Sequence, residues 1–311
     1  MMSLENDKYA IVYHANCIDG LSAFAVALFG LMRKGVKSKD IEAIPGYYNH
    51  KGDFEFARDR YVYIVDFSYK AEHIAQMVEI ARSVTLIDHH QLAYETLHAE
   101  LPFYLRENSS KFKSFCNHKE SGALLTWKHF FPNQEAPVVV RHVSDRDTWT
   151  FAMEKSREVH AALSAFSDDP WVYAEAFWRA YSSGGLDSLY REGEVLMNRF
   201  EKDLESVLRQ SYEVRLDAFS DHPIPILNAS GMFASEAGNI LAEKSPSKMA
   251  IIWTMHKDGL KLMLRSSVTG PDVARICKLF WNGGGHVNAA GATLSDPDEI
   301  RDFLSHIIPA L

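Results

Sequence analysis

Aspartate and histidine side chains recur in the first half of this 311-residue sequence, each time shortly after an apolar run. They are His14 and Asp19, Asp66, the triplet Asp88, His89 and His90, and the pair Asp145 and Asp147. Carboxylates brought together repel one another, and some take up protons unless a strong positive charge is present. Carboxylates and imidazoles without a thiolate cluster are typical ligands of manganese, magnesium or zinc. One or two such ions can activate water and hold a phosphoryl group, so the residue types indicate a metal site for phosphoryl chemistry.

A parallel sheet would bring these residues together. Strands are expected at 9–13, 61–65, 84–87 and 137–140, and helices at 21–34, 71–82 and 121–131, with Ser121 as the cap of the last. Runs that are apolar at nearly every position and alternate with helices predict a parallel sheet with helices on both faces. Ligands of such sheets bind beyond the carboxyl ends of the strands, so the polar side chains are expected along one rim.

The remainder of the chain has a different pattern of expected helices and strands. A helical region at 156–210 includes one long charged helix over 186–209, and a hairpin (249–255 and 260–264) and a short helix (272–280) follow. The sequence therefore predicts three parts. They are an α/β metal-binding domain at 1–185, a helical linker at 186–210 and a smaller α+β domain at 211–311.

Two features of the last part suit a phosphate group. Gly284 and Gly285 end a run of three glycines, and His286 follows it directly. Such a run can bring backbone N–H groups close to an anion. A flexible turn is the alternative explanation. Arg265 and Ser266 end the hairpin strand, where the guanidinium could bind phosphate or simply lie on the surface.

Composition excludes several other classes of protein. The net charge of −8 works against coating long duplex DNA, and 47% hydrophobic with 24% charged residues is ordinary globular composition. Cys17, Cys116 and Cys277 are far apart, so a disulfide framework is not expected. The apolar stretch 20–32 is too short to cross a membrane, and residues 1–8 do not resemble a signal peptide. These observations favour a soluble cytoplasmic protein with no membrane partner.

Six motifs occur in a specific order: HANCIDG (14–20), VDFS (65–68), DHH (88–90), SDRD (144–147), LRSS (264–267) and GGGHVNAAG (283–291). Together they resemble the DHH/DHHA1 phosphoesterase superfamily over nearly the whole chain. That superfamily includes nanoRNases, RecJ-type exonucleases, phosphodiesterases for dinucleotides, and exopolyphosphatases. The resemblance implies a parallel-sheet DHH domain, a linker helix and a DHHA1 domain that grips the substrate.

The resemblance also implies a role for each matching residue. Metal ligands would be His14, Asp19, Asp66, His89 and Asp145, with Asp66 bridging two ions. Asp88 would orient its neighbours, His90 would face the phosphate, and Asp147 would only support the ligands. The residues that would bind the substrate are Arg265, Ser266, Gly284, Gly285 and His286.

The first motif departs from the family pattern of two aspartates separated by one residue. Cys17 stands at the earlier position, so one ion would lose a carboxylate. Asn16 or Cys17 could replace it, or that site could be weak or empty; a thiolate would favour a softer ion such as zinc. A smaller departure is Asn282, at a place where a further glycine is common.

The sequence thus predicts a metal-dependent phosphodiesterase for short oligonucleotides or for linear or cyclic dinucleotides, with His90, Asp66 and Asp88 as catalytic residues. Manganese is the expected ion, with magnesium or zinc as alternatives. Residues 211–311 contain nine Lys and Arg against eleven Asp and Glu, so they offer no basic track for a long polyanion. An exopolyphosphatase, a nucleotide phosphomonoesterase and a non-catalytic nucleotide-binding regulator remain open, as does a homodimer.

Overall fold

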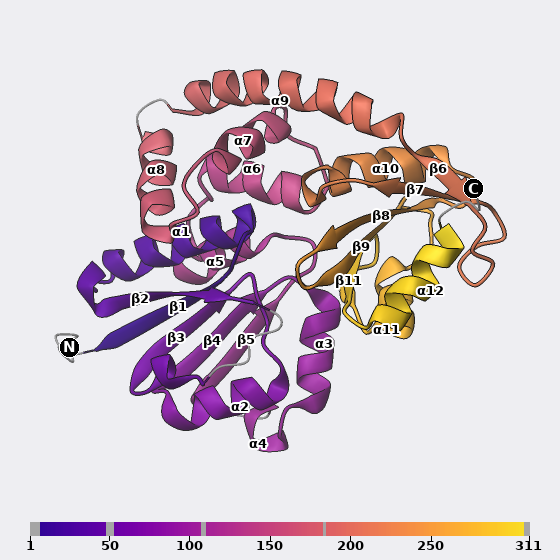
Figure 1. Cartoon of the computed structure of the whole chain (residues 1–311). Helices are drawn as coiled ribbons and strands as arrows, with labels where there is room; N and C mark the ends of the chain where they lie inside the picture. Colours follow the sequence, from indigo (N-terminus) through magenta and orange to yellow (C-terminus); the bar gives the residue numbers. More distant parts are fainter. Residues whose placement is uncertain (1–6, 48–52, 107–109, 183–184, 308–311) are drawn as a thin grey trace. The chain divides into compact units, whose positions relative to one another are not determined.

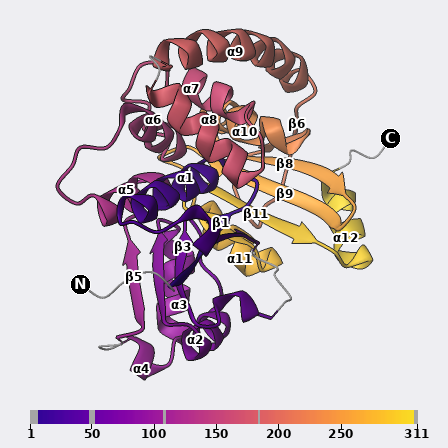
Figure 2. The same cartoon turned by 90° about the vertical axis from the view of Figure 1, so that its left-hand side faces the viewer.

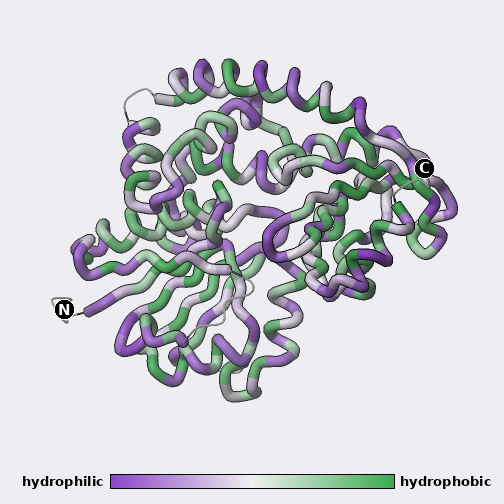
Figure 3. Tube along the Cα trace, in the orientation of Figure 1, coloured by the Kyte–Doolittle hydropathy of each residue, from purple (hydrophilic) through white to green (hydrophobic). Residues whose placement is uncertain are grey.

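The chain divides after Met197 into two compact units (Figure 1). A computed structural model describes residues 7–47, 53–106, 110–182 and 185–307 of them. Residues 1–6, on which the expectation about a signal peptide partly rests, lie outside these ranges. The division falls within helix α9 (Leu186–Leu208), which alternates hydrophilic and hydrophobic residues along its length (Figure 3). Within the described ranges, no helix combines the length and apolarity needed to span a bilayer.

Unit 1 is built on a five-stranded parallel sheet with the order β2-β1-β3-β4-β5. The strands are β1 (Lys8–His14), β2 (Ile41–Gly46), β3 (Arg60–Val65), β4 (Ser83–Asp88) and β5 (Phe112–Cys116). The runs at 9–13, 61–65 and 84–87 are confirmed as strands. Strands β2 and β5 were not expected because they are the edges of the sheet. Their exposed positions interrupt any continuous apolar run.

Helices cover both faces of this sheet, as predicted (Figures 1 and 2). One face carries α1 (Ile18–Arg33), α5 (Gly122–Phe130), α6 (Val138–Asp147), α7 (Ser156–Ser164) and α8 (Pro170–Ser182). The other carries α2 (Ala71–Ile80), α3 (Gln91–Glu100) and α4 (Phe103–Arg106). Short 3-10 turns η1 (Ser38–Asp40) and η2 (Glu55–Ala57) precede β2 and β3.

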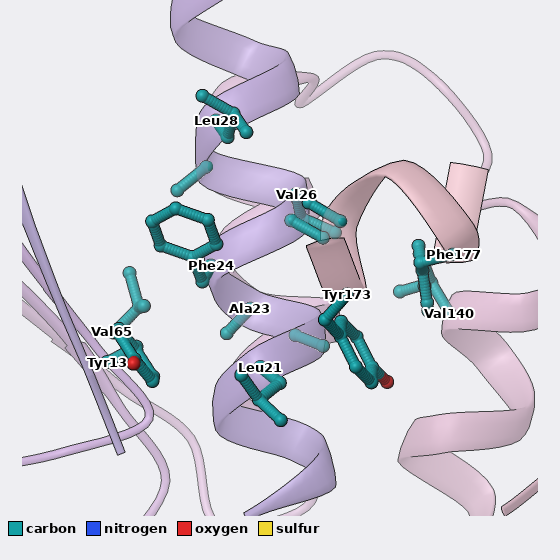
Figure 4. Close-up of a cluster of buried hydrophobic side chains, with 14 of the residues drawn as sticks. Tyr13, Leu21, Ala23, Phe24, Val26, Leu28, Val65, Val140, Tyr173 and Phe177 are labelled. Atoms are coloured by element: carbon teal, nitrogen blue, oxygen red, sulfur yellow. The ribbon is translucent and has the colours of Figure 1, made fainter. Parts of the chain in front are cut away.

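Alternation along the central strands builds a separate core on each face. Ile11 and Val65 pack with α1, whereas Ala10 and Ile64, their neighbours in sequence, pack with α2. Figure 4 shows Phe24 of α1 in the first of these cores, on the side of the helix that faces Tyr13 and Val65. Two apolar cores, one on each face, therefore hold the sheet in place beneath the carboxyl ends of its strands.

The run 137–140 forms the start of α6, so the expectation of a strand there is wrong. Val139, Val140 and Val143 are all buried in the apolar core to which α1 contributes, and their spacing is helical. Four apolar residues are too few to distinguish a strand from the buried face of a helix. This difference affects Asp145 and Asp147, which are two positions apart on α6. Residues two positions apart on a helix point about 200° away from each other around its axis, so the two carboxylates leave α6 on different sides.

Unit 2 contains a six-stranded mixed sheet with the order β10-β11-β9-β8-β7-β6. The strands are β6 (Tyr212–Val214), β7 (Ile224–Asn228), β8 (Met249–His256), β9 (Gly259–Ser266), β10 (Gly284–His286) and β11 (Ala289–Leu294). A 3-10 turn η3 (Gly231–Phe233) precedes the helices α10 (Ala234–Lys244), α11 (Val273–Trp281) and α12 (Pro297–Ile307). The predicted hairpin is β8 with β9, and the predicted short helix is α11. Pro225 obscures β7 in the sequence, because proline usually marks a break in a sheet.

Gly20 offers a test of how tightly α1 is seated against β1. A Cβ added there would stand 2.2 Å from the carbonyl oxygen of His14. We expect Gly20→Ala to lower the free energy of unfolding by about 1–3 kcal/mol, although alanine favours helices, because backbone must move to make room. Chemical denaturation followed by circular dichroism measures the change.

The matched control is Gly231→Ala, whose added Cβ meets only the sulfur of Met263, at 3.6 Å. This control is expected to stay within about 0.5 kcal/mol of the parent protein. Equal stability of the two variants would contradict the tight seating of α1.

Candidate metal centre

The chemistry-bearing residues of unit 1 gather at the carboxyl ends of β1, β3 and β4. His14 ends β1, Asp66 follows β3, and Asp88 ends β4 with His89 directly after it. Strand order reverses between β1 and β3, and open parallel sheets bind their ligands at such a reversal. Asp66 adopts a left-handed backbone with φ of 57°, which aspartate tolerates better than most residues.

Asp66 lies at the centre of this rim and is fully buried. Nε2 of His89 is 3.0 Å from its Oδ1, and Nδ1 of His14 is 3.5 Å from its Oδ2. Burial alone would raise the pKa of Asp66, but the contacts and charges of His14 and His89 outweigh it and hold that pKa well below its usual value. The buried oxygens of Asp66 are therefore anionic and available to a cation.

Among the described residues of unit 1, three sets of potential metal ligands occur, and all three contain Asp66. The sets are His14 with Cys17 and Asp66, Asp19 with Asp66 and His89, and Asp66 with Asp88 and His90. In each set the ligand atoms lie within 4.8 Å of one another. A carboxylate shared in this way fits a position between two ions.

Three carboxylates surround Nε2 of His89, at 3.0 Å for Asp66, 3.5 Å for Asp147 and 3.9 Å for Asp19. Burial, followed by the charges of Asp66 and Asp147, raises the pKa of Asp19 well above its usual value. Burial likewise raises the pKa of Asp147. Burial lowers the pKa of His89, but the three carboxylates outweigh this and raise it. The cluster thus concentrates negative charge, and a bound divalent cation would relieve the repulsion.

Helix α5 begins against this cluster and holds Asp19 in place. The backbone N–H of Gly122 donates to Oδ2 of Asp19 at 2.6 Å, and that of Ala123 donates to Oδ1 at 3.0 Å. A Cβ on Gly122 would lie 2.4 Å from Cβ of Asp66, so only glycine allows this approach. Ser121 caps the helix as predicted. Sequence reasoning missed Gly122, whose only signal is its place directly after the cap.

Asp88 anchors the two histidines that follow it. Its Oδ1 accepts hydrogen bonds from the backbone N–H of His89 at 2.7 Å and of His90 at 3.2 Å, and it lies 2.8 Å from Nδ1 of His90. Its Oδ2 accepts from the hydroxyl of Ser68. With its oxygens occupied by these donors, Asp88 suits an orienting role better than metal ligation.

The structure places Asp147, and not Asp145, beside His89, whereas the ligand role expected for Asp145 stays a prediction. The carboxylate of Asp145 accepts hydrogen bonds from Ala152 N at 2.7 Å, Met153 N at 3.1 Å and Ser156 Oγ at 2.6 Å. Asp147 directs Oδ2 towards His89 instead. The cause is that α6 is a helix, so the two side chains leave it on different sides.

Unit 2 holds Arg265 and Ser266 at the end of β9. The guanidinium of Arg265 donates to the carbonyl of Leu264 at 2.9 Å and to Oγ of Ser235 at 3.0 Å. Ser266 is buried, and its hydroxyl accepts from Nδ2 of Asn288 at 2.9 Å. Both side chains are therefore pre-positioned by neighbouring polar groups.

The glycine run is ordered differently from the anion-binding turn that the sequence suggested. Gly284, Gly285 and His286 form strand β10, which pairs with β11 in a hairpin. Gly285 has φ of 143°, and a Cβ there would stand 2.4 Å from the carbonyl oxygen of Ala289. Glycine is needed to let the two strands meet, and phosphate binding by this segment stays a prediction.

Comparisons with known proteins agree with this architecture. Residues 227–311 match the DHHA1 domain family. Uncharacterized protein R106 of Acanthamoeba polyphaga mimivirus is 27% identical over 297 residues, which cover 92% of this chain and 67% of that protein.

Two solved structures share the fold at low sequence identity. An exopolyphosphatase-related protein from Bacteroides fragilis is 15% identical, with a TM-score of 0.54 over 97% of this chain and 92% of its own. RecJ in complex with Mn²⁺ from Thermus thermophilus is 17% identical, with a TM-score of 0.52 over 97% of this chain. The match covers 52% of RecJ, so this chain spans about half of that enzyme's length.

The fold and the site define a class of protein with an α/β unit that ends its strands in aspartates and histidines, followed by a DHHA1 domain. The triplet Asp88-His89-His90 stands at the end of β4, within the first of these two parts. Residues 227–311 belong to the DHHA1 domain family, and the chain shares its fold with the two solved structures above.

Asp145 and Asp147 should respond to mutation in opposite ways. Asp147→Asn removes charge from a crowded cluster, so we expect it to raise the melting temperature without metal and to reduce the rise that Mn²⁺ causes. Asp145→Ala leaves three donors without their acceptor, so the metal-free protein should lose about 1–3 kcal/mol.

Thermal denaturation with and without Mn²⁺ measures both effects on each variant. Asp203→Asn, on the exposed part of α9, controls for the loss of one negative charge. A stabilised Asp145→Ala or a destabilised metal-free Asp147→Asn would reverse the assignment.

Proposed function

We propose that this protein is a metal-dependent phosphodiesterase that hydrolyses short nucleotide substrates with activated water. The observation that carries the proposal is the group of three carboxylates around Nε2 of His89, centred on the buried Asp66. Such a concentration of negative charge is costly to fold unless a cation binds there. The resemblance of the motifs to the DHH/DHHA1 phosphoesterases, together with the DHHA1 domain at 227–311, supports phosphoester chemistry at the same rim.

The proposed metal ligands are His14, Asp19, Asp66, His89 and Asp147. Their oxygen and nitrogen donors suit Mn²⁺, and RecJ, which shares the fold, is known in complex with that ion. A divalent ion at such a site lowers the pKa of water and polarises the phosphoryl group. Asp147 takes the place first expected for Asp145.

The protein's own residues orient the ligands and the phosphate. Asp88 fixes the ring of His90 through Nδ1, which directs that imidazole towards a phosphate oxygen. Helix α5 fixes Asp19 through two backbone N–H groups. In unit 2, Arg265 and His286 are proposed to bind a substrate phosphate, with Ser266 and the glycines of β10 holding them in register. Positively charged donors at phosphate oxygens supply the electrostatic stabilisation on which phosphoryl transfer depends.

A short substrate is favoured over a long polyanion. The net charge is −8, and residues 211–311 contain nine basic and eleven acidic residues. The similarity to an exopolyphosphatase-related protein keeps inorganic polyphosphate as the second candidate substrate. Three free cysteines suit the reducing cytoplasm, where we place the enzyme.

A substrate panel with Mn²⁺ tests the proposal directly. The panel contains dinucleotides to pentanucleotides, cyclic dinucleotides, long single strands and inorganic polyphosphate. We expect the highest kcat/KM on the short nucleotides, and Asp66→Asn should lower kcat by at least about a hundredfold, because it removes the central anion at almost unchanged shape.

The Asp203→Asn variant again serves as the charge control and should retain activity. Polyphosphate as the best substrate would establish the second candidate. Full activity of Asp66→Asn would refute the metal centre.

Cys17 gives a separate prediction about the ions. Its thiol lies with ligand atoms of His14 and Asp66, within 4.8 Å. We expect the Co²⁺-substituted protein to show a sulfur-to-cobalt charge-transfer band in the near ultraviolet and Cys17→Ser to lack it. Cys17→Asp should bind Mn²⁺ about tenfold more tightly, because an anionic oxygen suits a hard cation better. An absorption spectrum that Cys17→Ser leaves unchanged would exclude the thiolate as a ligand.

A further inference from the structure

Two guanidinium groups lie over two aromatic rings in the segment 146–157, which includes Asp147 and the residues after it. The guanidinium carbon of Arg146 lies 4.2 Å from the ring centre of Trp149 and 5.6 Å from that of Phe151. That of Arg157 lies 4.4 Å from the ring of Phe151. The two rings are 4.9 Å apart, with planes at 73°. We name these four residues the stacking cluster.

The backbone of this segment is strained in order to present the rings. Trp149 has φ of 58° and Phe151 has φ of 49°, a left-handed conformation that bulky aromatic residues rarely adopt. Asp145 enforces it, because its carbonyl oxygen accepts the N–H groups of Thr150 at 3.0 Å and Phe151 at 3.3 Å. Strain that the surroundings maintain in this way tends to occur at binding sites.

Core packing does not account for the arrangement. Trp149 and Phe151 are both partly exposed, and Arg157 is exposed. None of the three belongs to the apolar core that α6 and α7 share with α1. The stacking cluster therefore presents aromatic and cationic surface to solvent.

The position of the cluster relates it to the candidate metal centre. Trp149 is two residues beyond Asp147, so their Cα atoms are at most about 7 Å apart. Asp147 itself faces His89 within the centre. A nucleotide whose phosphate lies at the centre could therefore bring its base to Trp149.

We propose that the stacking cluster binds a nucleobase of the substrate, the one on the nucleoside next to the phosphate that is attacked. Every base has a flat π face, and tryptophan, phenylalanine and arginine are the side chains on which bases stack. The arginines also add positive charge beside a phosphodiester chain. This inference rests on the proposed function and narrows its substrate class, because inorganic polyphosphate has no base to stack.

Matched substrates and variants test the stacking role. The substrates are a dinucleotide and an abasic analogue with the same sugar–phosphate chain. Trp149→Ala should raise KM for the dinucleotide about tenfold and leave KM for the analogue unchanged, whereas Trp149→Phe keeps a ring and should lose far less. Phe103→Ala, an exposed aromatic on α4, is the control and should change neither value.

Equilibrium binding of both compounds, measured by calorimetry, separates this inference from the proposed function. A preference for the dinucleotide that Trp149→Ala abolishes supports base stacking, even if the protein hydrolyses neither compound. Equal losses for both compounds, or a preference that survives in Trp149→Ala, would overturn it. Hydrolysis that is absent while the preference persists would count against the phosphodiesterase alone.

Discussion

Repulsion among buried carboxylates is the constraint on which the design of unit 1 depends. Asp19, Asp66 and Asp147 all approach one imidazole nitrogen of His89. Like charges at such distances in a site that is largely buried oppose folding and disturb the pKa of every member. The structure shows the conflict in opposite shifts, because the pKa of Asp66 is lowered while those of Asp19 and Asp147 are raised. A divalent cation bound to such a cluster would offset this repulsion.

The surrounding elements offset part of that cost before any ion binds. The start of α5 supplies two N–H donors to Asp19, and the missing side chain of Gly122 lets it come close enough. The imidazole nitrogens of His14 and His89 lie beside the carboxylate of Asp66. Two cores, one on each face of the sheet, keep the ends of β1, β3 and β4 at fixed separations. The site is thus distributed over elements far apart in sequence, and the sheet makes it rigid.

Much of this could be predicted from the sequence, because the central strands of a covered parallel sheet are continuous apolar runs. Each such run ends in a polar residue, and the shared direction of the strands brings those residues together. Prediction failed where that signal is interrupted or ambiguous. The edge strands β2 and β5 alternate with exposed residues, and the run at 137–140 suits a strand and a helix equally. Roles that depend on close approach, such as that of Gly122, leave no pattern of charge or hydropathy to detect.

The different positions of Asp145 and Asp147 show what the helical geometry achieves. A strand followed by a loop could have sent both carboxylates to the metal centre, which would have increased the repulsion there. On α6 the two carboxylates diverge, and only Asp147 adds to the charge around His89. Asp145 instead accepts hydrogen bonds from the segment that carries Trp149 and Phe151, through both its carboxylate and its carbonyl oxygen. The end of α6 therefore has two roles: it directs Asp147 towards His89, and it maintains the strained backbone of the segment that follows. A displacement of that turn would therefore alter the metal centre and the stacking cluster together.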